Sequence, residues 1–308
     1  MLKLVKKLAL IALPIIIYFA IFIAFEPYNY FGLKHSEYTA DSAIVRVRQF
    51  NADPADVVIL GDSRVAHFDM DKVEEYVGEE VSQLSFGGAS LNESMDLLEY
   101  ALEKNENIHT VYFSVSFYTL NESYYKDRMS SIETIATNPF AYMLNFNYNV
   151  EMLNEIKWFI KGEKNVASDH HEDWKEEDYY YPDGTPRQYR RNLEEYALNS
   201  IYPVCENYKL DEADVERYIR LAQKCRDMGI TVYTVLPPMD DSLKDLVIEP
   251  LGIYRQVEPF IRQAEECTTV LNYEYRQPNY FTSDEFYDGF HLDDFTGLPK
   301  FTQMLFER

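Results

Sequence analysis

The chain is short of cysteine, and this shortage restricts both its disulfide chemistry and its metal chemistry. Its 308 residues include three cysteines, Cys205, Cys225 and Cys267. An odd number with separations of 20 and 42 residues excludes a disulfide framework and does not match the spacing of a zinc site. We therefore expect buried free thiols, with a single disulfide as the alternative.

Basic residues are also scarce relative to acidic ones. The chain has 29 Lys and Arg against 52 Asp and Glu, which gives a formal net charge of −23. This charge excludes nucleic acid as a partner, because the phosphate backbone binds cationic surfaces. It also argues against broad adsorption to an anionic membrane surface. A solvated acidic surface accounts for the charge, and a preference for a cationic partner or substrate is the alternative.

Cofactor and metal motifs are missing as well. The sequence has no Gly-rich phosphate loop of either standard form, so we predict no cofactor. One run, Asp169-His170-His171-Glu172-Asp173, contains residue types that ligate metals. Because adjacent side chains rarely converge on one ion, we expect a solvated loop there and predict no metal site, with a metal site as the alternative.

The longest uncharged stretch lies near the N-terminus. Leu8–Phe25 is an apolar run of 18 residues, preceded by Lys3, Lys6 and Lys7 and ended by Glu26. Its length nearly matches the hydrocarbon core of a bilayer, so we predict a transmembrane anchor. The positive-inside rule places the N-terminus in the cytoplasm and the remaining chain outside the cell membrane. A cleaved signal peptide and a buried core helix are the alternatives.

Beyond residue 54 the pattern is that of an α/β domain. Short apolar segments rich in β-formers alternate with segments of helical periodicity. The predicted strands are Val57–Leu60, Val81–Phe86, Thr110–Ser116, Thr231–Leu236 and Thr268–Tyr273. The predicted helices are Asp41–Phe50, Asp69–Val77, Ser90–Lys104, Asp211–Met228, Leu243–Glu266 divided by Pro250 and Pro259, and Phe295–Phe306. This alternation predicts a mostly parallel five-stranded sheet covered on both faces, with functional groups at the carboxyl ends of the strands.

We expect three parts along the chain. Residues 1–27 form the cytoplasmic stub and anchor, residues 28–54 a linker, and residues 55–308 the α/β domain. Residues 118–210 interrupt the βα rhythm and are rich in Tyr, Asn and Glu. We interpret them as an insertion of helices and loops over the carboxyl edge of the sheet. Its tyrosines either stack on sugar rings or pack inside the insertion.

The first predicted strand runs directly into Gly61-Asp62-Ser63-Arg64. A glycine at this point permits a sharp turn, since it adopts backbone angles that other residues avoid. Ser63 then lies at the carboxyl end of a strand and beside a helix N-terminus, whose free N–H groups attract anionic oxygen. This placement suits a nucleophile with an oxyanion donor next to it. The alternative is a βα turn in which Ser63 or Asp62 caps the helix.

A second candidate follows the fifth predicted strand, at the same edge of the sheet. Asp288 precedes His291 by three residues. A carboxylate at this separation can orient the imidazole and stabilise its protonated form, so that the histidine acts as a base toward a serine. A surface loop is the alternative for this short motif taken alone.

Together, Gly61-Asp62-Ser63 and Asp288-x-x-His291 resemble the first and last sequence blocks of the SGNH/GDSL hydrolase superfamily. The resemblance implies a flavodoxin-like three-layer α/β/α sandwich. It also implies that Ser63 is the nucleophile, His291 the base and Asp288 its orienting acid, with the Ser63 N–H as one oxyanion donor. The segment 84–90 is similar to the second block and supplies Gly87 or Gly88 as a further donor.

The third block of the family, Gly-x-Asn-Asp, is missing. The chain has the segment 115–121 in its place, and Asn121 is a candidate substitute at a different offset. For each of two residues near the serine, the sequence allows two roles. Arg64 either binds an anionic group of a substrate or pairs with a local carboxylate. His67 either lines the site or caps a helical turn.

The predicted anchor, the lost third block and the central insertion are similar to those of membrane-anchored, extracytoplasmic members of the superfamily. These members act beside membrane-bound O-acyltransferases in the acylation of cell-wall polymers and exopolysaccharides. The resemblance implies an extracytoplasmic serine esterase or O-acyltransferase whose substrate is an acylated cell-wall or exported polysaccharide. The alternative is a catalytically degenerate domain that binds polysaccharide or docks on a membrane acyltransferase.

Overall fold

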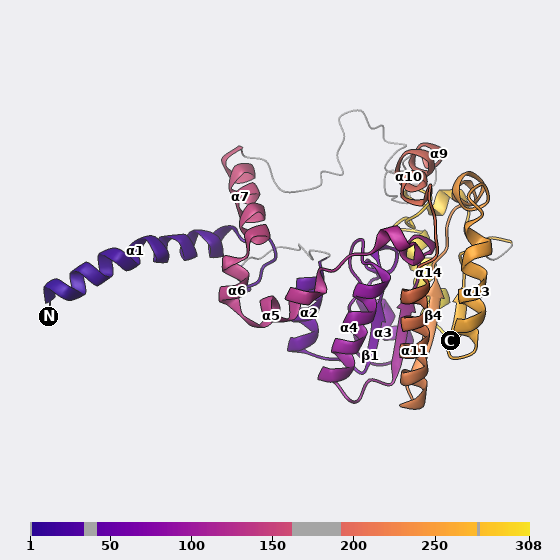
Figure 1. The fold of residues 1–308 in the computed structure, drawn as a ribbon, viewed down its shortest axis with the longest axis horizontal. Helices are drawn as coiled ribbons and strands as arrows, with labels where there is room; N and C mark the ends of the chain where they lie inside the picture. The colour runs from indigo at the N-terminus through magenta and orange to yellow at the C-terminus, as the bar shows by residue number, and fades with distance from the viewer. Residues whose placement is uncertain (1, 34–41, 162–191, 276–277) are drawn as a thin grey trace. The chain divides into compact units, whose positions relative to one another are not determined.

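The structure is a computed structural model, and it describes residues 2–33, 42–161, 192–275 and 278–308 (Figure 1). The chain divides into two compact units, neither of which is continuous in sequence. The first unit comprises residues 1–48 and 131–171, and the second comprises residues 49–130 and 172–308. The sheet and the predicted site residues belong to the second unit.

All five predicted strands are present and form one parallel sheet. They are β1 (Val57–Leu60), β2 (Val81–Gln83), β3 (Thr110–Ser114), β4 (Thr231–Leu236) and β5 (Thr269–Asn272). Their spatial order is β2-β1-β3-β4-β5, with Val57 aligned between Val81 of β2 and Thr110 of β3. The prediction of an α/β fold with a five-stranded parallel sheet is therefore confirmed. The strand order reverses at β1, and ligands of such sheets bind in the crevice at this switch point.

Helices cover both faces of the sheet (Figure 1). The covering helices are α3 (Met70–Val77), α4 (Leu91–Lys104), α11 (Glu212–Asp227), α13 (Ile253–Glu265) and α14 (Gly297–Phe306). On one face, Val57 and Ile59 share an apolar cluster with Phe301 of α14. On the other face, the ring of Phe113 lies 4.9 Å from that of Tyr218 on α11. Alternate residues of each strand thus enter opposite layers, as the pleat requires.

The predicted helix over Leu243–Glu266 has a different internal division. It consists of α12 (Asp241–Leu243), a π-helical turn over Lys244–Ile248, and α13, which begins after Gly252 at a φ of +62°. Pro259 lies inside α13 instead of dividing it, so that expectation was wrong. A proline in a helix removes one hydrogen bond. The buried apolar face of α13, which includes Val257 and Phe260, keeps the helix intact across it.

The described parts of the predicted insertion consist of helices and turns. They contain α5 (Met129–Thr137), α6 (Pro139–Leu144), α7 (Phe146–Lys161), α9 (Leu193–Tyr196) and α10 (Tyr202–Cys205). The acidic and histidine run Asp169–Asp173 lies outside the described residues. The linker contains α2 (Ala43–Ala52), close to the predicted helical segment.

The predicted anchor segment forms α1 (Leu2–Phe25), with Pro14 inside it. Nevertheless, none of the helices in the described ranges combines the length and the apolar character needed to cross a membrane. The transmembrane helix expected at the N-terminus is therefore not found there, and the extracytoplasmic localisation stays a prediction.

Candidate active site

The turn after β1 presents Ser63 at the carboxyl edge of the sheet. Gly61 adopts a φ of +139°, and a Cβ at this position would lie 2.5 Å from the Cβ of Ser114 on β3. Only glycine fits both the backbone angle and the close approach of the neighbouring strand. The Asp62 carboxylate accepts a hydrogen bond from the N–H of Arg64 at 3.1 Å and caps a 3-10 turn over Ser63–Val65. Asp62 therefore has the capping role, and the Ser63 hydroxyl is left for other partners.

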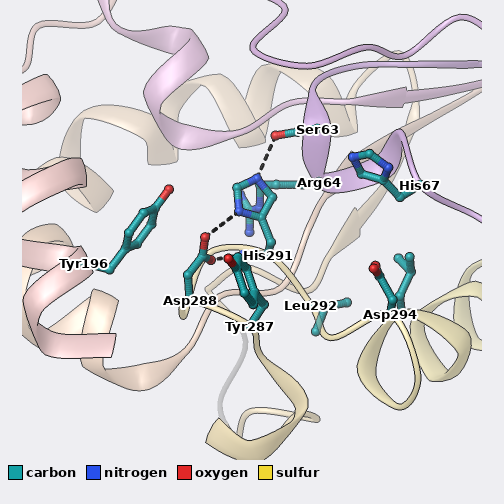
Figure 2. Close-up of a pocket in the computed structure, with 10 residues that line it drawn as sticks. Ser63, Arg64, His67, Tyr196, Tyr287, Asp288, His291, Leu292 and Asp294 are labelled. Atoms are coloured by element: carbon teal, nitrogen blue, oxygen red, sulfur yellow. Dashed lines mark hydrogen bonds and ion pairs between the residues drawn. The ribbon is translucent and has the colours of Figure 1, made fainter. Parts of the chain in front are cut away.

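Ser63, His291 and Asp288 form a continuous chain of hydrogen-bonding atoms (Figure 2). The Oγ of Ser63 lies 2.8 Å from Nε2 of His291, and Nδ1 of His291 lies 2.9 Å from Oδ2 of Asp288. The other carboxylate oxygen of Asp288 accepts hydrogen bonds from the backbone N–H groups of Phe290 and His291, at 3.0 and 2.7 Å. Residues separated by 228 positions in sequence thus meet with the geometry of a nucleophile, a base and an orienting acid.

The charge state of Asp288 supports this arrangement. Burial by itself would raise the pKa of this carboxyl group, since Asp288 is 2% exposed. The side-chain hydrogen bond and the charge of His291, with the two backbone N–H donors, outweigh burial and hold the pKa below its ordinary value. Asp288 is therefore an anion at neutral pH. An anion at Oδ2 favours a proton on Nδ1 of His291, which leaves Nε2 free to accept the Ser63 proton.

A cavity of about 300 Å³ opens beside these three residues. It is lined by Ser63, Arg64, His67, Tyr196, Tyr287, Asp288, His291, Leu292, Asp294 and Leu298. Figure 2 shows His67 and Asp294 together on one side of His291 and Tyr196 on the other. His67 thus lies in the cavity wall, which was one of its two predicted roles.

Sequence reasoning missed Tyr196, Tyr287 and Asp294 as individual cavity residues. Tyr287 and Asp294 flank the Asp288–His291 motif, so their proximity to the motif in sequence was an available signal. Tyr196 lies at the end of α9 in the tyrosine-rich insertion. Its position in the cavity depends on how the insertion folds back, which no local pattern specifies.

Arg64 has a structural role at this edge of the sheet. Its side chain is 1% exposed and its Nη1 lies 2.6 Å from Oε1 of Glu274, which is fully buried. Nη2 donates to the carbonyl oxygens of Pro237 and Pro238, both at 2.6 Å. The guanidinium also lies 4.7 Å from the ring centroid of Phe290, next to His291. Both Nη groups donate within the protein, so the predicted pairing of Arg64 with a carboxylate is confirmed, and its contact with a substrate stays a prediction.

The loop that contains Gly87 and Gly88 adjoins the serine turn, because the N–H of Phe86 donates to the carbonyl of Gly61 at 3.1 Å. Gly88 has a φ of +61°, and its carbonyl accepts hydrogen bonds from Lys126 Nζ and Arg128 Nη2, both at 2.9 Å. Neither glycine lines the cavity. The oxyanion role of their N–H groups stays a prediction.

Asn121 does not replace the missing third block. Its side chain is buried, its Nδ2 donates to the carbonyl of Val204 at 3.0 Å, and its Oδ1 accepts from the N–H of Lys209 at 3.2 Å. The amide thus joins two segments of the insertion, and Asn121 is not part of the cavity wall. The position of the side chain outside the cavity wall therefore does not support the prediction that Asn121 donates to an oxyanion.

Aromatic side chains occupy the turn after β3, at the place of the missing third block. Phe117 and Tyr118 are both buried there. The hydroxyl of Tyr118 donates to Oδ2 of Asp62 at 2.5 Å. Burial and the neighbouring Asp62 charge raise the pKa of Tyr118 well above its ordinary value, so the phenol keeps its proton. Tyr118 thus supports the serine turn, and no sequence pattern predicted this contact.

The described ranges contain neither an exposed cysteine nor a cluster of metal-ligating side chains. All three cysteines are free and buried, which confirms that prediction, and burial raises the pKa of the Cys205 thiol to about 12. A thiol in this state is a poor nucleophile at neutral pH. Within those same ranges, no group of three or more His, Cys, Asp or Glu side chains is placed to hold a metal ion.

Comparison of the chain with protein-family models and with curated protein sequences gives no match. The functional proposal therefore depends on the geometry of the site and on the sequence motifs that form it.

Proposed function

We propose that this chain is a serine ester hydrolase or O-acyltransferase of the SGNH type, with a flavodoxin-like three-layer α/β/α domain. The observation that carries the proposal is the continuous series Ser63 Oγ, His291 and Asp288, with separations of 2.8 and 2.9 Å. These three groups in this order are sufficient to activate a serine hydroxyl.

In the proposed reaction, Ser63 Oγ attacks the carbonyl carbon of an ester while Nε2 of His291 takes the hydroxyl proton. The tetrahedral intermediate then collapses, the bond to the leaving alcohol breaks, and His291 returns the proton to the departing oxygen. Water or an acceptor hydroxyl attacks the acyl-serine in the second half of the reaction and loses its proton to His291. The bond between the acyl carbon and Ser63 Oγ then breaks, and His291 returns the proton to Oγ. Ionised Asp288 stabilises the imidazolium in both halves.

The negative oxygen of the tetrahedral intermediate requires N–H donors. The Ser63 N–H is the first of a helical turn, and such N–H groups have no acceptor inside the turn. We propose this group as one donor and the Gly87 or Gly88 N–H as the second, because their loop is hydrogen-bonded to Gly61. Loss of one such donor typically costs about 3–4 kcal/mol of transition-state stabilisation.

We further propose that the substrate is an acylated cell-wall or exported polysaccharide. Tyr196 and Tyr287 in the cavity wall support a sugar ligand, because tyrosine offers an apolar ring face and a polar hydroxyl together. In this proposal the domain works outside the cell membrane, beside a membrane-bound O-acyltransferase.

Replacement of Ser63 tests the catalytic proposal. Ser63→Ala removes the nucleophile, so kcat for p-nitrophenyl acetate should fall by about 10⁴-fold or more. A fluorophosphonate probe should label the wild type and not the variant. Ser130→Ala, at an exposed serine in the same unit, is the matched control and should keep both properties. Unchanged turnover in Ser63→Ala would exclude Ser63 as the nucleophile.

A non-catalytic function is the second candidate. The observation that favours it is the hydrogen bond from the Asn121 side chain to the carbonyl of Val204, outside the cavity. A domain short of one oxyanion donor could bind an acylated polysaccharide, or dock on an acyltransferase, without cleaving an ester. In that case the fluorophosphonate probe leaves the wild type unlabelled, while Ser63→Ala retains the same glycan affinity as the wild type.

A further inference from the structure

The two units of the chain differ sharply in charge. Residues 1–48 and 131–171 contain nine Lys and Arg and eight Asp and Glu, a net charge of +1. The remaining residues contain 20 Lys and Arg and 44 Asp and Glu, a net charge of −24. The acidity of the chain therefore belongs to the second unit. Electrostatic repulsion does not keep the first unit from an anionic lipid surface.

Exposed apolar side chains are concentrated in the first unit. Of the 22 large apolar side chains that are exposed in the described residues, 15 belong to this unit, although it has 89 of the 308 residues. On α7, Phe146, Val150, Leu153 and Ile160 are exposed by 79%, 41%, 59% and 76%. Their separations of four, three and seven residues place them on one face of the helix. We call these four residues the α7 stripe.

Helix α1, in the same unit, also has exposed apolar side chains. Leu10 and Ile11 are exposed by 71% and 70%, and Ile16 by 60%. The two helices pack on each other, with the rings of Phe25 and Phe159 5.4 Å apart. The α7 stripe and the exposed side of α1 thus belong to one packed pair of helices.

The interior of the first unit is mainly apolar, with buried side chains such as Phe22 and Ile135, and it also encloses the acidic side chain of Glu26. Glu26 is 1% exposed and accepts hydrogen bonds from the Tyr142 hydroxyl and the Tyr28 N–H, both at 2.9 Å. The Tyr18 hydroxyl donates to Oδ1 of Asn149 on α7 at 2.9 Å. A buried, hydrogen-bonded carboxyl group in a unit whose surface has many exposed apolar side chains is consistent with contact with lipid, because polar groups of such helices turn away from the hydrocarbon.

We infer that the first unit docks on a lipid bilayer, with the α7 stripe and the exposed side of α1 inserted among the acyl chains. The inference goes beyond the proposed catalytic function, because it assigns a membrane contact to part of the central insertion. It requires no helix to cross the membrane, since apolar faces insert from the bilayer surface. Lys157, which lies on the face of the α7 stripe, extends its ammonium group to the lipid headgroups.

A tryptophan reporter in the α7 stripe tests this contact in the full-length chain. The chain has two tryptophans, Trp158 and Trp174. Both are replaced by Phe, so that the fluorescence comes from one newly introduced Trp. The test chain carries Leu153→Trp. The matched control carries Met228→Trp, at a site of the second unit that is 53% exposed. Each chain is mixed with vesicles of phosphatidylcholine and phosphatidylglycerol, and the acyl chains of these lipids are either brominated or unmodified.

The Leu153→Trp chain should lose most of its emission on brominated vesicles and shift its maximum to the blue, while the Met228→Trp chain keeps its intensity. In a second arm, Leu153→Ser with Ile160→Ser should reduce the fraction of chain that floats with vesicles, whereas Met228→Ser should not. Equal emission of the Leu153→Trp chain on the two kinds of vesicle would overturn the inference. Concentration-dependent burial of Trp at position 153 without lipid would also overturn it, by assigning the α7 stripe to contact between protein chains.

Discussion

Two turns at the carboxyl edge of the sheet, the one after β1 and the one after β3, have opposite characters. The first exposes a hydroxyl to a cavity and positions it with a capping carboxylate. The second is filled by Phe117 and Tyr118, which are buried and supply no group to the cavity wall. The difference shows that reactive groups and packing groups come from different turns of the same edge. The β1 turn supplies a reacting group, and the β3 turn stabilises the β1 turn by packing.

Two contacts join the turns. The Tyr118 hydroxyl donates to Asp62, and Nη1 of Arg64 donates to Oγ of Ser116 at 3.2 Å. Arg64 also connects the β1 turn to the ends of β4 and β5 through Pro237 and Glu274. The position of Ser63 is thus determined by its neighbours on both sides.

The largest expected effect is a loss of kcat that distinguishes the function of the two turns. Asp288→Asn should leave the fold intact and lower kcat for an ester substrate by about 10⁴-fold, because an amide no longer favours the productive tautomer of His291. Asn121→Ala, in the β3 turn, should keep kcat within a few-fold of the wild type. Both are measured with p-nitrophenyl acetate on chains whose folding is verified by circular dichroism.

The Asn121→Ala variant tests whether the β3 turn contributes to catalysis. A loss of about 10²–10³-fold in kcat would identify Asn121 as an oxyanion donor and would contradict the assignment of that turn to packing. Asp284→Asn, at an exposed carboxylate near the His291 loop, controls for charge and should have no effect on kcat.

The next effect concerns the ion pair that anchors both turns. Glu274→Ala removes both the counter-charge and the hydrogen-bond acceptor of the buried Arg64 guanidinium, so the free energy of unfolding should fall by about 3–5 kcal/mol. Glu258→Ala, in an exposed ion pair with Arg262, is the matched control and should cost less than about 1 kcal/mol. Urea titration measures both values. Equal losses in the two variants would show that the buried pair does not hold the edge together.

A smaller effect tests the direct contact between the turns. Tyr118→Phe removes the donor to Asp62 Oδ2 and leaves a buried carboxylate oxygen poorly satisfied, which should lower the free energy of unfolding by about 1–3 kcal/mol. Tyr125→Phe, at a side chain that is 60% exposed, should be neutral. A neutral result for Tyr118→Phe would mean that the β1 turn is stable without support from β3.

The contrast between the turns also explains what the sequence could predict. The strand boundaries of β1 and β4 follow from short apolar runs ended by Gly61 and Pro237, so their extent was predictable. The meeting of Ser63 with His291 followed from parallel topology, because both come after strands of one sheet. These inferences need only periodicity and the rule that strand ends share an edge.

The support of the site was not predictable in the same way. Arg64 had two plausible roles, and only the fold brings Glu274 and two proline carbonyls to its guanidinium. The hydrogen-bond partners of Asn121 lie more than 80 positions away in the chain, so these hydrogen bonds depend on tertiary packing. Local patterns locate groups that follow strands, but they do not say which long-range partner each group takes.

The smallest expected effect is a pH dependence that comes from Glu274. Burial raises the pKa of Glu274 to about 6 from an ordinary 4.5, although Arg64 opposes the shift. A raised carboxyl pKa means that the folded chain binds more protons than the unfolded chain between these two values, so this group's contribution to stability falls as pH rises through that window. The difference in unfolding free energy between wild type and Glu274→Gln should therefore shrink by about 1 kcal/mol from pH 5 to pH 7. Urea titrations at both pH values measure it, and a difference that grows over this interval would show that Arg64 outweighs burial and that the edge is held by a fully favourable ion pair.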